Sequence, residues 1–129
     1  MDNRIKLSDS GINEILDLLK SKDNKYFRFM PRDMDSDKNP RVFMAELGLD
    51  YDDVINILKN LTKEDFYECL LDRKNNYIYL YVYKKEIEGV LTYIKIGFLY
   101  NIKTGNVDVV SFHKDMEVWI WKLLREKKK

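Results

Sequence analysis

Apolar residues recur along the first half of the chain with the period of an α-helix. In the segment 10–21 they fall at i, i+3, i+4 and i+7: Ile12, Ile15, Leu16 and Leu19. The segment 50–61 follows the same rule with Val54, Ile57, Leu58 and Leu61. A shorter helix is predicted between them, because Asn39 and Pro40 favour a helix start and Gly48 favours a helix end.

The second half of the chain has the period of a β-strand. The run YIYLYVY predicts a strand over 77–83, and further strands are predicted over 90–100 and 107–113. Residues 84–89 and 101–106 are predicted to connect them. A short strand is predicted over 26–30, and residues 66–71 form either a strand or a helical turn capped by Thr62. A helix over 115–125 closes the chain.

These elements predict an α+β fold in a single domain, 1–129. Helices that precede consecutive strands favour an antiparallel β-meander sheet, with the N-terminal helices packed on one face. Alternation then predicts the two faces. The helix side is expected to hold the aliphatic and phenylalanine residues Ile78, Leu80, Val82, Ile94, Ile96, Phe98, Val110 and Phe112. The opposite side is expected to hold Val109 and the polar or aromatic residues Tyr77, Tyr79, Tyr81, Tyr83, Tyr93, Lys95, Ser111 and His113.

Composition excludes several function classes. A formal net charge of +1 gives no overall basic field for nucleic acid, although local patches remain possible. One cysteine and one histidine exclude an internal disulfide and a cysteine-based zinc site, so we expect no metal and no cofactor. The start of the chain lacks the features of a signal peptide, and no apolar run is long enough to span a membrane. We therefore expect a cytoplasmic protein.

The predicted polar face can be interpreted in two ways. A lysine can hold a phosphate, a histidine can transfer protons near neutral pH, and tyrosines can stack on bases. Together they suggest cleavage of single-stranded RNA without a metal. Tyrosine is also a favoured strand residue, however, and a lone histidine at a strand end is commonly structural. A protein-binding face, or an edge strand that pairs with a partner, explains the pattern at least as well.

Four short motifs occur in an order that belongs to a known family. They are "ELGL" at 46–49, "DFY" at 65–67, "YIK" at 93–95 and "SFH" at 111–113. Between residues 46 and 114 the chain resembles the motility quorum-sensing regulator (MqsR) family of bacterial type II toxins. The resemblance implies a RelE-like fold and a metal-independent endoribonuclease that cleaves single-stranded mRNA. It also implies a partner antitoxin that neutralises the toxin.

The resemblance also implies site residues. Tyr93 matches the active-site tyrosine of the family, and Lys95 matches the lysine of the same motif. His113 occupies a position that is basic in the family, and Lys114, the next residue, is a further candidate. Some flanking residues are expected to contact RNA: Tyr67, Arg73, Lys74 and Tyr81. Two positions depart from the family pattern, because Glu68 replaces a common lysine and Leu80 replaces a polar residue. These departures keep a second hypothesis open, in which the fold is a catalytically inactive protein that binds and occupies a protein partner.

Overall fold

The computed structural model describes residues 4–29, 39–72, 78–98 and 105–116. They form one sheet of six strands in the spatial order β1-β3-β4-β5-β6-β2. The strands, in chain order, are β1 (Arg4–Ile5), β2 (Phe27–Phe29), β3 (Phe66–Leu71), β4 (Tyr79–Ile87), β5 (Val90–Phe98) and β6 (Val107–Lys114). Every neighbouring pair is antiparallel except β2 and β6, which are parallel. The α+β class and the antiparallel meander are confirmed.

The helices begin and end where local capping signals place them. They are α1 (Asp9–Ser21), α2 (Pro40–Leu47) and α3 (Tyr51–Lys59). The Ser8 and Asn39 side chains accept hydrogen bonds from the first turns of α1 and α2. Asp50 and Asp53 form a reciprocal capping box on α3, and Gly48 ends α2 with a φ of 70°. No helix in the described ranges is long and apolar enough to cross a membrane.

Two short elements complete the path between helix and sheet. A 3₁₀ turn, η1 (Asn24–Tyr26), leads from α1 into β2. A second, η2 (Lys63–Asp65), leads from α3 into β3, so the helical turn and the strand predicted as alternatives after Thr62 both occur. The predicted closing helix over 115–125 lies outside the described residues beyond Met116.

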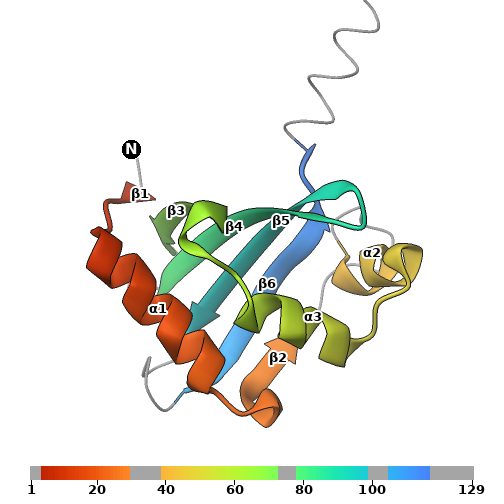
Figure 1. Ribbon diagram of the computed structural model, residues 1–129, viewed down its shortest axis with the longest axis horizontal. Helices are drawn as coiled ribbons and strands as arrows, with labels where there is room; N and C mark the ends of the chain where they lie inside the picture. The colour runs from red at the N-terminus through yellow and green to blue at the C-terminus, as the bar shows by residue number, and fades with distance from the viewer. Residues whose placement is uncertain (1–3, 30–38, 73–77, 99–104, 117–129) are drawn as a thin grey trace, which may run out of the picture.

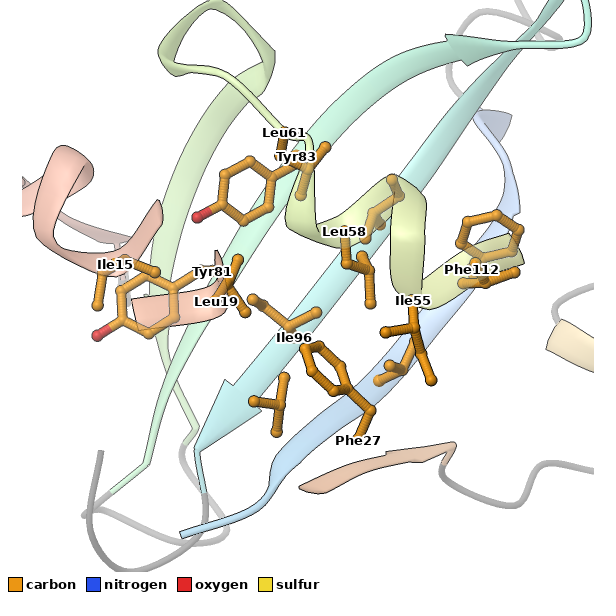
Figure 2. Packing of buried hydrophobic residues seen from close by; sticks show 14 of the residues in the cluster. Ile15, Leu19, Phe27, Ile55, Leu58, Leu61, Tyr81, Tyr83, Ile96 and Phe112 are labelled. Carbon is orange, nitrogen blue, oxygen red and sulfur yellow. The ribbon is translucent and has the colours of Figure 1, made fainter. Parts of the chain in front are cut away.

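All three helices lie on one side of the sheet (Figure 1). Their apolar stripes pack on the central strands, where Leu19 and Leu58 are fully buried with Ile94, Ile96 and Phe112. Figure 2 shows this cluster between the helices and the sheet. We call this side the helix face of the sheet and the other side the open face, because no helix in the described residues crosses it.

The face predicted for β4 is wrong. Tyr81 and Tyr83 belong to the hydrophobic core on the helix face, opposite Ile96 and Ile94 of β5. Their even-numbered neighbours Leu80 and Val82 therefore lie on the open face, and Tyr79 lies on the same face as Tyr81. Tyr77 lies outside the described residues. The physical reason is the register of the β4–β5 hairpin, which sets odd-numbered residues of β4 opposite even-numbered residues of β5.

The turn of that hairpin contains only Glu88 and Gly89, both with positive φ, at 50° and 77°. Ile87 therefore pairs with Val90, and the residues predicted as the connection 84–89 extend β4 instead. A two-residue turn of this kind fixes the register of the whole hairpin. It places Tyr83 directly opposite Ile94, and directly opposed side chains share a face.

A bulge in β6 corrects a second face assignment. The register shifts between Lys95 and Ile96 of β5, so that Lys95 pairs with Ser111 and Ile96 with Val109. Val110 is the extra residue. As a result Val109 is fully buried in the core, where Val110 was expected, and Val110 is only half-buried.

Candidate functional site

Cross-strand register gathers polar side chains on the open face. One row across the sheet pairs Lys84 of β4 with Tyr93 of β5, and Tyr93 with His113 of β6. The next row pairs Val82 with Lys95 and Lys95 with Ser111. Of the predicted catalytic residues, Tyr93, Lys95 and His113 thus lie on adjoining positions of one face. We call Lys84, Tyr93, Lys95 and His113 the open-face cluster.

The aromatic rings of Tyr93 and His113 stack on each other. Their centroids are 5.1 Å apart, and the ring planes differ by only 14°. His113 is 6% exposed, and its Nδ1 lies 2.8 Å from the carbonyl oxygen of Lys114. Because a carbonyl oxygen only accepts, Nδ1 donates the proton in this bond. The bond and the stacking together fix the orientation of the imidazole ring.

The electrostatic surroundings keep the Tyr93 hydroxyl protonated. Burial raises the pKa of Tyr93, and the negative charge of Glu68 raises it further, while Lys84 acts in the opposite direction. Asp115 also contributes to the rise. At neutral pH this side chain is therefore a hydrogen-bond donor rather than a phenolate.

Lys84 is the cluster member that sequence reasoning missed. Its Nζ lies 3.2 Å from the Oδ2 atom of Asp115 and 3.9 Å from the ring centroid of Tyr67. Asp115 is 3% exposed, and its backbone N–H donates to the Leu91 carbonyl at 2.9 Å. The ammonium group is thus held between a buried carboxylate and an aromatic face. The two-residue hairpin turn was the signal that could have placed Lys84 opposite Tyr93.

The other predicted cations occupy different positions. The Nζ of Lys95 is 6.0 Å from the Tyr93 ring centroid. Lys114 pairs with Thr92 at the end of β6, and alternation directs its exposed side chain away from the face that carries His113. Arg73 and Lys74 lie outside the described residues.

The predicted RNA-contacting tyrosines also separate. Tyr67 lies at the register shift of β3, is 49% exposed, and borders the cluster through its contact with Lys84. Tyr81 is buried on the helix face, which removes it from the candidate site.

The two departures from the family pattern also lie on the open face. Glu68 pairs with Val82, and its Oε2 lies 3.7 Å from the Nε of Arg4. Leu80 is half-buried between Leu70 and Gly97 rather than in the main core where we predicted it. Within the described ranges no group of three or more His, Cys, Asp or Glu side chains is arranged to hold a metal ion.

The fold and the cluster define a small α+β protein whose sheet carries a stacked tyrosine–histidine pair beside lysines. A family model described as "Motility quorum-sensing regulator, toxin of MqsA" matches residues 33–114. The chain belongs to this family, and the resemblance seen in the sequence motifs is confirmed. The family consists of toxins of toxin–antitoxin systems and implies an antitoxin partner. No curated protein matches the chain.

Proposed function

We propose that the chain is a metal-independent endoribonuclease that cleaves single-stranded mRNA at the open-face cluster and is neutralised by an antitoxin. The observation that carries the proposal is the stacking of Tyr93 on His113, with the ammonium of Lys84 in the same cross-strand row. A proton acceptor, a hydroxyl donor and a cation are the groups that such a cleavage requires.

The reaction assigns one task to each group. Nε2 of His113 accepts the proton of the ribose 2′-hydroxyl, and the 2′-oxygen attacks the neighbouring phosphorus. The bond from phosphorus to the 5′-oxygen breaks, and the departing oxygen takes a proton from water. The products are a 2′,3′-cyclic phosphate and a 5′-hydroxyl end. Tyr93 donates a hydrogen bond to a non-bridging phosphate oxygen, and Lys84 and Lys95 stabilise the charge that develops there.

A cleavage assay on mixed-sequence RNA in EDTA tests the proposal. We expect His113→Ala and Tyr93→Phe each to reduce the cleavage rate about 100-fold, within the range for losing a positioned acid or base or a transition-state donor. Tyr79→Phe is the matched control, because Tyr79 is an exposed tyrosine of the same sheet outside the cluster. The mechanism would be contradicted if wild-type cleavage required added metal. It would also be contradicted if both active-site variants cleaved RNA at the wild-type rate.

A specific observation favours the second candidate, a non-catalytic protein-binding role. The carboxylates of Glu68 and Asp115 stand beside the cluster and offset part of its positive charge. Occupation of an edge strand is less favoured, because β1 and β2, at the two edges, have only two and three residues. Folded wild-type protein that cleaves no RNA but binds a protein through Tyr67 and Tyr93 would support this candidate.

A further inference from the structure

A groove of about 650 Å³ lies on the helix face, on the opposite side of the sheet from the open-face cluster. It runs between α1 and β4, and we call it the α1 groove. Its apolar walls include Leu7, Ile15 and Leu18. Its volume falls within the range of about 300–1,000 Å³ that is typical of ligand pockets.

The polar side chains that line the α1 groove are two carboxylates and two hydroxyls, of which that of Ser21 donates to the Leu18 carbonyl within α1. Glu14 and Asp17 are exposed residues of α1 that line it, and neither is in an ion pair with a described residue. Tyr81 lines it from the sheet. Figure 2 shows the Tyr81 hydroxyl extending past Ile15 towards the α1 side of the core.

The Tyr81 hydroxyl opens into the α1 groove. The residue is 6% exposed, and its hydroxyl makes no hydrogen bond with any described residue. A ligand with a donor group can therefore supply a hydrogen bond to this oxygen within the groove. Burial raises the pKa of Tyr81 to about 12, with smaller contributions from Cys69, Tyr79 and Glu14, so the hydroxyl remains neutral and can accept a hydrogen bond.

We propose that the α1 groove binds an arginine-bearing apolar segment of a partner protein. The aliphatic stem of the arginine would lie along Ile15 and Leu18, as long cationic side chains commonly do on apolar surfaces. Its guanidinium group carries several donors in a fixed fork and so can reach the carboxylates of Glu14 and Asp17 and the oxygen of Tyr81 together. Charge complementarity selects a cationic segment over an acidic one, because both charged residues among the described lining of the groove are acids.

This site is independent of the proposed ribonuclease activity. The groove residues lie on the helix face, whereas Tyr93 and His113 lie on the open face. A segment bound in the α1 groove would therefore leave the RNA site uncovered. Variants of Glu14 and Asp17 are expected to cleave RNA at the wild-type rate. Peptide binding therefore tests the groove, and RNA cleavage tests the open-face cluster, independently of each other.

Two matched peptide pools test the proposal against full-length protein. The first contains acetyl-X-Arg-X-amide tripeptides, with X as Leu, Ile, Val or Phe, and the second has glutamine in place of arginine. Amide shifts in NMR spectra identify the site, and titration gives the affinity. We expect the arginine pool to shift α1 and β4 amides and to bind at least about 10-fold more tightly than the glutamine pool.

Variants then locate the interaction. Glu14→Gln with Asp17→Asn should weaken binding about 10-fold or more, and Tyr81→Phe should weaken it by a smaller factor without removing a charge. Glu46→Gln, which removes an exposed acid of α2, should have no effect. Equal binding of the two pools, shifts located elsewhere, no binding at millimolar concentration, or binding that survives the double variant would each overturn the proposal.

Discussion

Tyr83 and Tyr93 are tyrosines of adjacent strands that lie on opposite faces of one sheet. Tyr83, on the helix face, is fully buried, and its hydroxyl has no hydrogen-bond partner among the described residues. Tyr93, on the open face, is half-buried and stacks on His113. Burial raises the pKa of both hydroxyls. A tyrosine hydroxyl thus destabilises the fold where it is buried without a partner on the helix face. On the open face the same hydroxyl is a hydrogen-bond donor beside a histidine and a lysine.

The largest expected difference between the faces is in stability, and two consecutive residues of β6 measure it. Phe112 is fully buried and lies 5.6 Å, between ring centroids, from Phe43. Phe112→Ala should lower the free energy of unfolding by about 3–5 kcal/mol, because it leaves a cavity in the core. His113→Ala should lower it by about 1 kcal/mol. Urea unfolding measures both, and equal losses would mean that the open face is as much a core as the helix face.

Alkaline pH is the next test of the buried helix face. Burial raises the pKa of Cys69 to about 11 and of Tyr81 to about 12, and it also raises that of Tyr83, all on the helix face. The unfolded chain ionises at the ordinary values, 9.0 for the thiol and 10.0 for the phenols. The folded state therefore loses stability as the pH rises above these values, and keeps it fully below them.

For Tyr81 alone, a pKa moved from 10.0 to about 12 corresponds to at most about 3 kcal/mol, an upper limit because solvent in the groove screens part of the effect. Urea unfolding at a series of pH values between about 8 and 12 should show the decline. Tyr81→Phe should make it less steep, whereas Tyr51→Phe, a change at an exposed tyrosine, should not. A free energy of unfolding that stays constant across this range would contradict the assignment of these groups to a buried face.

Lys84 and Lys85 offer a smaller but sharper comparison, because consecutive strand residues point to opposite faces. Lys84 belongs to the open-face cluster, and Lys85 forms a 3.5 Å ion pair with Asp65. Lys84→Gln should reduce RNA cleavage about 10-fold, or about 1.4 kcal/mol, by removing a charge near the phosphate. The glutamine amide can still donate to Asp115, which limits the structural damage. Lys85→Gln is the control, and equal losses in the two variants would remove Lys84 from the site.

Sequence reasoning predicted well what local interactions determine. The boundaries of α1, α2 and α3 follow from Ser8, Asn39, Gly48 and Asp50, each of which acts within a few residues of its own position. The shared face of Tyr93, Lys95 and His113 was also predicted, because each strand contributes its own alternation.

Sequence reasoning failed where pairing register and irregularities, not side-chain character, decide the face of a strand. The helix face of β4 was assigned from the aliphatic character of Leu80 and Val82, although the turn at Glu88 and Gly89 sets Tyr83 opposite Ile94. That signal was present in the sequence, because Ile87 and Val90 flank a pair suited to positive φ. The bulge at Val110 has no comparable local signal. β1 has two residues and pairs with distant β3, so it leaves no periodic pattern to detect.

The smallest expected effect compares one substitution on the two faces. Tyr83→Phe removes a buried hydroxyl that lacks a partner, so it should raise the free energy of unfolding by about 1 kcal/mol and leave RNA cleavage unchanged. Tyr93→Phe removes a hydroxyl from the open-face cluster and should reduce cleavage with little change in stability. Urea unfolding and the EDTA cleavage assay on both variants give the four values. A loss of stability in Tyr83→Phe would mean that its hydroxyl has a bonding partner in solution, and the contrast between the two tyrosines would then disappear.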